Sequence, residues 1–157
     1  MRKVITSVVG IDRSSHTQQQ WLDLERNAIV RVTSEDPNFP IESALTGSKE
    51  AGWRAATPGD QMICIVFDRP RSLHRILLEF WERDVERTQE FTLRWASPGG
   101  SSKEIVRQQW NFSPQGSTIE VEDYQVRIEN VSVLELALKP DLRRQTALAS
   151  LAALRVA

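Results

Sequence analysis

The sequence is poor in the residues that carry metal, redox and nucleophilic chemistry. Its 157 residues include one cysteine, Cys64, and two histidines, His16 and His74. A single cysteine cannot close a disulfide within the chain, and the histidines lack the spacing of a metal-ligand motif. Cys64 lies inside an apolar run, which favours a packed thiol over a reactive one. No P-loop, dinucleotide fingerprint or nucleophile elbow is present, so the sequence predicts a protein that is not an enzyme.

Long apolar runs and an excess of one charge are also missing. No window approaches the roughly 20 apolar residues of a membrane-spanning helix. The chain carries 20 Lys and Arg against 21 Asp and Glu, and the net charge of −1 argues against a generally basic nucleic-acid binder. Polar residues interrupt the apolar residues from Val4 to Ile11, and no cleavage site follows them, so they indicate a first strand and not a signal peptide. We therefore expect a cytoplasmic protein, or a secreted one if the chain is a fragment.

What the sequence does have is a pattern of apolar residues that repeats every two positions. From about residue 28 onward, apolar and polar residues alternate, which is typical of β-strands. The run Met62–Phe67 is apolar on both sides, which indicates a central strand covered on both faces, or one whose second face is partly screened by loops. Asp68 to Arg71 is expected to end that strand, because Pro70 cannot donate to a central ladder. The alternation predicts strands at 28–33, 62–67, 76–80, 91–95, 105–110, 118–121, 124–128 and 134–138.

Seven or more short strands between turn signals indicate two packed sheets or a barrel, and hence an all-β domain. Two segments are ambiguous. Residues 143–154 are rich in helix formers, yet they also fit a loop that leads into a closing strand from Leu151 to Val156. Residues 13–26 fit either a short helix or an irregular lead-in.

One constellation resembles the discoidin or coagulation-factor type C family. Ala44-Leu45-Thr46-Gly47-Ser48, a four-residue gap, Trp53 and the strand Gln61–Phe67 are similar to that family's Ala-Leu-Asp-Gly-Asn, Trp and Gln-led strand. The resemblance covers roughly residues 28–157. It implies an antiparallel jelly-roll β-sandwich of the galactose-binding-domain-like kind, with about eight strands and a closing strand at the carboxyl terminus. Residues 1–157 then form a single domain, in which 1–27 are an N-terminal extension or first strand.

The resemblance also bears on calcium. Members of that family frequently hold the ion in the first of these loops with carboxylate and carbonyl oxygens. This sequence has Thr46 and Ser48 where the family often has Asp and Asn, so a carboxylate is lost. Glu42 or Glu50 could substitute for it. No cofactor is expected, and calcium at Glu42, Thr46, Ser48 and Glu50 is the alternative.

Strand parity places the longest connections at one end of the sandwich. Segments 33–60, 82–89, 111–117 and 139–149 share this end, whereas 68–72, 97–102 and 129–132 are compact turns at the other. Long loops on a rigid scaffold commonly carry recognition residues, and the resemblance implies ligand sites at the same end. The groups there that suit sugar rings and hydroxyls are Trp53, Arg54, Arg83, Arg87, Trp110, Asn111, Arg143 and Arg144.

These observations predict a non-catalytic binding module for a carbohydrate or small polar ligand. Trp53 has a competing interpretation as a core residue, because its counterpart in the family packs beneath the first loop. A protein-interaction or assembly module is the first alternative function, and nucleic-acid binding through an Arg-lined face is the second. The 16 arginines are interleaved with acids, which disfavours a nucleic-acid partner. The oligomeric state is left open.

Overall fold

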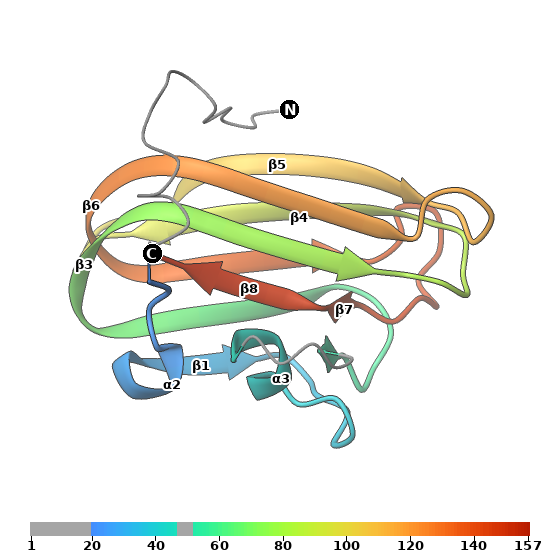
Figure 1. The fold of residues 1–157 in the computed structure, drawn as a ribbon, viewed down its shortest axis with the longest axis horizontal. Coiled ribbons are helices and arrows are strands. Elements are labelled where there is room, and N and C mark those ends of the chain that lie inside the picture. Colours follow the sequence, from blue (N-terminus) through green and yellow to red (C-terminus); the bar gives the residue numbers. More distant parts are fainter. Residues whose placement is uncertain (1–19, 47–51) are drawn as a thin grey trace.

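The computed structural model describes residues 20–46 and 52–157, which form two facing antiparallel layers (Figure 1). Two long strands, β3 (Gln61–Trp81) and β6 (Ile119–Lys139), bend near their middles and so belong to both layers. The predicted all-β sandwich of about eight strands is confirmed.

The larger layer has five strands and the smaller has three. In the larger layer the order is β1 (Ala28–Val32), the first half of β3, the second half of β6, β4 (Arg87–Ala96) and β5 (Lys103–Phe112). In the smaller layer, the second half of β3 lies between β8 (Ala153–Val156) and the first half of β6. The bends therefore let two strands tie both layers into one hydrogen-bonded structure.

The remaining elements are short and cover one side of the sandwich. Helix α2 (Leu24–Asn27) begins after Asp23, whose side chain accepts a hydrogen bond from the backbone N–H of Arg26. Helix α3 (Glu42–Leu45) lies in the long connection after β1, and buries Ala44 and Leu45. Strand β2 (Trp53–Arg54) pairs with β7 (Ser150–Leu151), which joins that connection to the carboxyl-terminal segment.

The core lies between the layers and follows the predicted alternation. Ile76, Leu78 and Phe80 on β3 are fully buried, and the Phe80 and Phe91 rings stack with their centroids 5.4 Å apart. Each such side chain contributes about 1.5–3 kcal/mol through burial. The alternation of apolar residues therefore sets which strand faces meet.

Three of the predicted breaks between strands are wrong. The chain does not leave the sheet at Asp68 to Arg71; β3 continues through it as a bend. The register with β6 shifts between Val66 and Arg71, so Pro70 falls where the ladder is irregular and needs no N–H partner. In the same way the predicted strands between 118 and 138 are one strand, β6, with Asn130 at a φ of 59° in its bend.

The ambiguous segments are resolved by packing. The carboxyl-terminal segment closes the smaller layer as a strand, and residues 143–149 form a loop, so helix propensity is overridden by pairing with β3. Residues 24–27 form a short helix, as one of the two interpretations predicted. The suggested first strand between Val4 and Ile11 lies outside the described residues.

The outer face of the Met62–Phe67 segment is partly screened, as one interpretation predicted. Ile63, Ile65 and Phe67 are buried in the core, while Met62 on the opposite face is 42% exposed. Cys64 shares that outer face and is half-buried. Burial, with the nearby Glu135 charge, raises the pKa of its thiol, which keeps the thiol protonated and unreactive.

The pairing also confirms the predicted separation of long and short connections. The turn after β4 and the bends of β3 and β6 lie at one end of the sandwich, on the left in Figure 1. The described parts of the long connection after β1, 33–46 and 52–60, reach toward the opposite end, where the connections 82–86, 113–118 and 140–149 also lie. We call these the closed end and the loop end.

Candidate functional site at the loop end

Two adjoining hollows open at the loop end and form what we call the rim hollow. Their volumes are about 380 Å³ and 260 Å³, and the larger lies in the range of roughly 300–1,000 Å³ typical of small-molecule sites. They share four lining residues, which come from β2, from the connection after β3 and from β7: Arg54, Glu82, Asp84 and Ser150. The larger hollow adds Trp81, Arg83 and Ala152, and the smaller adds Val85, Asp141, Arg144, Thr146, Ala147 and Leu148.

Glu82 orders the connection after β3. Its Oε2 accepts hydrogen bonds from the backbone N–H groups of Asp84 and Val85, at 3.2 and 3.3 Å. Its Oε1 accepts from Arg87 Nε at 2.7 Å, in an ion pair whose arginine side chain is fully buried. This carboxylate therefore fixes one wall of the rim hollow and is already used in doing so.

Arg87 holds several loops together from beneath. Its Nη1 donates to the Pro140 carbonyl at 2.8 Å and to Gln89 Oε1 at 3.2 Å, and its guanidinium lies 4.7 Å from the Phe112 ring centroid. With the Glu82 ion pair, this side chain thus joins two connections of the loop end, 82–86 and 140–149, to the end of β5. The hydrogen bonds of Nε and Nη1 and the ion pair with Glu82 offset the cost of burying this charge, although the buried Nη2 has no partner among the described residues.

Backbone hydrogen bonds fix the opposite wall. The N–H of Gly59 donates to the Ala147 carbonyl at 3.1 Å, which joins the connection before β3 to the one after β6. Asp141 Oδ1 accepts from the N–H groups of Thr88 and Arg143, at 3.4 and 3.1 Å. The rim hollow is therefore built from loops that are held in place before any ligand binds.

Three exposed arginines surround the opening. The Arg83 guanidinium stacks on the Trp81 ring, 5.3 Å from its centroid, and the Arg54 guanidinium stacks on Phe39 at 4.8 Å. Arg144 lines the smaller hollow from the connection after β6. Stacking holds a guanidinium plane in place while its edge N–H groups still point outward.

Two of the eight predicted contact residues are placed inside the protein, which corrects the sequence interpretation. Trp53 is 0% exposed, and its Nε1 donates to the Ser34 carbonyl at 3.1 Å, so the competing core interpretation holds. The Arg87 side chain is also 0% exposed, and it positions loops instead of meeting a ligand. Sequence placed both residues correctly at the loop end but could not show the direction of either side chain.

Three others lie at the loop end but outside the rim hollow. Arg143 Nη2 donates to Thr88 Oγ1 at 2.9 Å, and Thr88 Oγ1 donates to Asn111 Oδ1 at 2.8 Å, on the outer face of β4 and β5. Trp110 is half-buried, with Nε1 donating to Ser117 Oγ at 3.1 Å. Of the eight candidates, the rim hollow thus brings together Arg54, Arg83 and Arg144.

Ten of the thirteen lining residues were not among the predicted contact residues, including Trp81 and Asp84. Trp81 is the last residue of β3 and forms a wall of the larger hollow. Asp84 follows in the connection after β3 and lines both hollows. The sequence signal for both was available in their position: they flank the end of β3, where the chain enters the loop end.

The calcium alternative gains no support from the described residues. Glu42 and Thr46 lie at the two ends of α3, where the Glu42 carbonyl accepts from both the N–H and the Oγ1 of Thr46. Ser48 and Glu50 lie outside the described residues. Over 20–46 and 52–157, no group of three or more His, Cys, Asp and Glu side chains could hold a metal ion.

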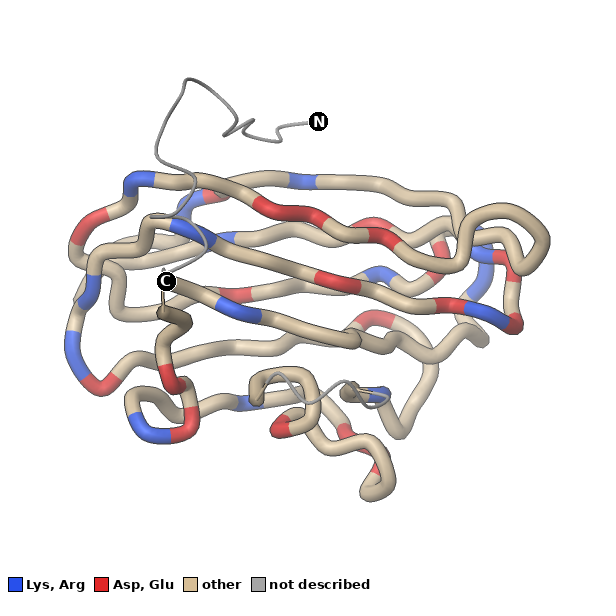
Figure 2. Tube along the Cα trace, viewed as in Figure 1, with Lys and Arg blue, Asp and Glu red and all other residues tan. Residues whose placement is uncertain are grey.

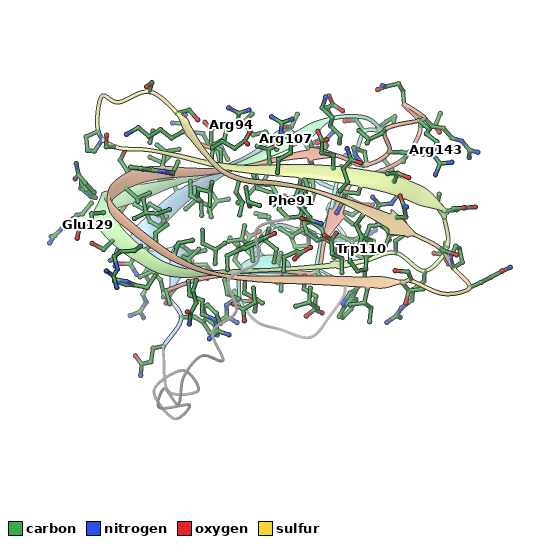
Figure 3. The ribbon with its side chains drawn as sticks, turned by 90° about the horizontal axis from the view of Figure 1, so that it is seen from above. Phe91, Arg94, Arg107, Trp110, Glu129 and Arg143 are labelled. Carbon is green, nitrogen blue, oxygen red and sulfur yellow. The ribbon has the colours of Figure 1, made fainter. Side chains whose placement is uncertain are left out.

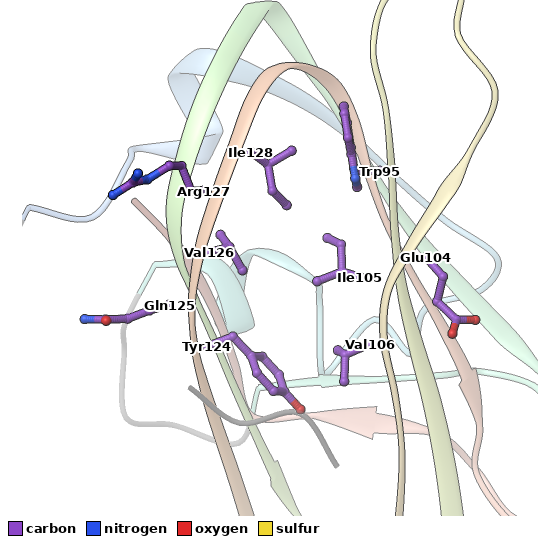
Figure 4. A pocket seen from close by; sticks show the side chains of 9 residues that line it. All are labelled: Trp95, Glu104, Ile105, Val106, Tyr124, Gln125, Val126, Arg127 and Ile128. Carbon is purple, nitrogen blue, oxygen red and sulfur yellow. The ribbon is translucent and has the colours of Figure 1, made fainter. Parts of the chain in front are cut away.

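A further cavity has a different character. It opens between β5 and the first half of β6 with a volume of about 320 Å³, and its walls are mostly apolar (Figure 4). Trp95, Ile105, Val126 and Ile128 line it, with Tyr124 at one side. The other lining side chains, Glu104, Gln125 and Arg127, point away from the cavity in Figure 4, so its interior offers few partners for sugar hydroxyls and we place the candidate site at the rim hollow.

Charges of both signs alternate along the described chain (Figure 2). Figure 3 shows Arg94 and Arg107 on the outer side of the larger layer, Phe91 between the layers, and Glu129 and Arg143 at opposite ends. Arg94 and Arg107 both lie near Glu104, and Arg107 also pairs with Glu90, so two carboxylates compensate the two arginines on that face. In the described part of the chain, no helix is long and apolar enough to cross a membrane.

Comparisons with known proteins show which solved structures share this architecture. No family model and no curated protein matches the sequence. Among solved structures, the module CBM32-3 from a family 31 glycoside hydrolase of Clostridium perfringens is 19% identical, with a TM-score of 0.63 and coverage of 87% of this chain and 93% of that one. The family 32 carbohydrate-binding module of NanJ from C. perfringens, in complex with galactose, is 14% identical, with a TM-score of 0.61 and coverage of 87% and 96%.

A third structure extends the range of ligands among these neighbours. The CBM32 of AlyQ, in complex with 4,5-unsaturated mannuronic acid, is 16% identical, with a TM-score of 0.57 and coverage of 88% of this chain and 98% of that one. At these identities the likeness establishes the fold. It confirms the galactose-binding-domain-like jelly roll that the discoidin resemblance implied.

Proposed function

We propose that this chain is a non-catalytic carbohydrate-binding module whose site is the rim hollow. The observation that carries the proposal is one cavity at the loop end that combines an indole wall with hydrogen-bonding groups of both kinds. Trp81 supplies apolar surface for the C–H face of a sugar ring, and Arg54, Asp84 and Ser150 supply donors and acceptors for its hydroxyls.

The neighbours with the same fold support this proposal. One was solved in complex with galactose and another in complex with 4,5-unsaturated mannuronic acid. The non-catalytic part of the proposal is supported by the rim hollow itself. Its carboxylates Glu82 and Asp141 are engaged in ordering loops, which leaves Asp84 without a second free carboxylate for an acid and base pair.

The test is a glycan array followed by titration calorimetry on the positive glycans. We expect Trp81→Ala to weaken binding about five- to thirtyfold, because loss of a stacked wall costs about 1–2 kcal/mol. Trp110→Ala is the matched control, since it removes an equally half-buried indole outside the rim hollow. An array without any hit would overturn the function, and equal losses for the two variants would overturn the site.

A specific feature also favours a second candidate, a protein-interaction module. Ile29 on β1 is 59% exposed and Met62 on β3 is 42% exposed, and both lie on the outer face of the larger layer. Exposed apolar side chains on a sheet face are typical of protein contacts. Light scattering on the wild type and on Ile29→Ser tests this candidate. If both proteins are monomers and no partner protein is captured, the protein-interaction function is excluded.

A further inference from the structure

The carboxylates that line the rim hollow have more partners within the protein than the arginines that line it. This difference points to the class of glycan that the hollow can bind. Three arginines and three carboxylates line it: Arg54, Arg83, Arg144, Glu82, Asp84 and Asp141. The formal count is balanced, but a carboxylate that is already hydrogen-bonded or ion-paired offers a ligand little. What matters is which of the six groups is still available.

Two of the three carboxylates are used inside the protein. Glu82 is ion-paired with the buried Arg87 at 2.7 Å and also accepts two backbone N–H groups. Asp141 is 7% exposed and accepts the N–H groups of Thr88 and Arg143. Only Asp84 remains as an exposed carboxylate of the lining.

The arginines, in contrast, are exposed and uncompensated. Within the described residues, no carboxylate lies within salt-bridge distance of the Arg54, Arg83 or Arg144 guanidinium. Arg54 and Arg83 contact aromatic rings, which do not neutralise charge. Because Arg87 offsets Glu82, the groups that can meet a ligand carry an excess of positive charge.

We propose that the rim hollow prefers an acidic glycan, one whose sugar ring carries a uronate carboxylate. The planar, forked guanidinium groups match the two oxygens of a carboxylate and form short charge-assisted hydrogen bonds with it. Trp81 lies beside Arg83 in the same wall, so a ring stacked on the indole would hold its carboxylate within reach of a guanidinium. This inference rests on the proposed carbohydrate-binding function and narrows its ligand class.

The experiment compares trigalacturonate with its fully methyl-esterified form by calorimetry. The ester keeps the rings and hydroxyls but removes the charge. We expect the acid to bind at least tenfold more tightly in low salt, and the gap to shrink as sodium chloride is raised, because added ions screen exposed charges.

Adjacent arginines give a matched pair of variants. Arg144→Gln should weaken binding of the acid by roughly tenfold, whereas Arg143→Gln should leave it unchanged, since that side chain is bonded to Thr88 outside the rim hollow. Asp84→Asn provides a test in the opposite direction: it should tighten binding of the acid two- to threefold and leave the ester unaffected. A merely structural role for Asp84 would not produce that gain.

The outcomes separate the two proposals. Equal affinity for acid and ester, or tighter binding of a sulfated oligosaccharide than of trigalacturonate, would overturn the preference for a uronate and leave the carbohydrate-binding function intact. Failure to bind either probe, together with an array without hits, would overturn the function itself.

Discussion

The two ends of the sandwich are made from the same strands but are held together differently. At the closed end the chain turns within a few residues, as at Gly99, or bends without leaving the sheet, as β3 and β6 do. At the loop end the connections are too long for ladder hydrogen bonds to order them. Buried polar side chains such as Arg87 and close backbone packing such as that at Gly52 take over this role.

This comparison teaches that the loop end needs its own internal framework before it can recognise anything. A rigid rim loses little conformational entropy when a ligand binds, which favours affinity. The same framework makes the loop end sensitive to substitutions that the closed end should tolerate. The following experiments test whether the loop end and the closed end differ in this way.

The largest effect is expected from Arg87→Ala. The change leaves Glu82 near the core without its partner, which should cost about 3 kcal/mol of unfolding free energy by chemical denaturation. Arg94→Ala, on the outer face near Glu104, is the control and should cost much less. The double variant Arg87→Met with Glu82→Gln should recover most of the loss, because no unpaired charge then remains buried. A cost no larger than that of Arg94→Ala would contradict the framework role.

A pair of glycines compares the two ends directly. Both Gly52 and Gly99 have positive φ, 75° and 69°. A Cβ on Gly52 would lie 2.3 Å from the Leu151 carbonyl oxygen, whereas one on Gly99 would meet nothing within 4 Å. Gly52→Ala should therefore lower the free energy of unfolding, measured by thermal melts, by about 3 kcal/mol. Gly99→Ala should lower it by only about 1 kcal/mol, because backbone strain acts there alone. Equal losses would mean that the connection moves freely away from β7.

The smallest effect lies between the two ends, at Tyr124. Burial, with the nearby charges of Glu122 and Glu120, raises the pKa of its hydroxyl above the ordinary value. The folded state thus favours the protonated phenol, so the stabilisation is complete below about pH 10 and is lost as the pH rises above it. We expect titration of Tyr124 to lower the unfolding free energy by about 1 kcal/mol between pH 10 and 11, and Tyr124→Phe to reduce the slope by that amount. Parallel pH profiles for the two proteins would show that another group titrates.

Much of the fold follows from the sequence, and specific residues show where the prediction stops. The alternation of Ile76, Leu78 and Phe80 predicted their burial, because the period of two is a local property of a strand. The strand end at Pro70 was wrong, since whether a proline interrupts a ladder depends on the register of the neighbouring strand. The residues around Pro70 do not by themselves determine that register.

The candidate site, like the fold, was predicted only in part from the sequence. The sequence determined the alternation of the strands, the loop lengths and the set of polar and aromatic groups placed at one end. Only the tertiary structure decided that Trp53 and Arg87 point inward while Trp81 and Arg144 face the rim hollow. The physical reason is that a side chain's burial depends on what the rest of the fold brings against it. For Arg87 the partners include Glu82, five residues away in sequence, and Pro140, 53 residues away.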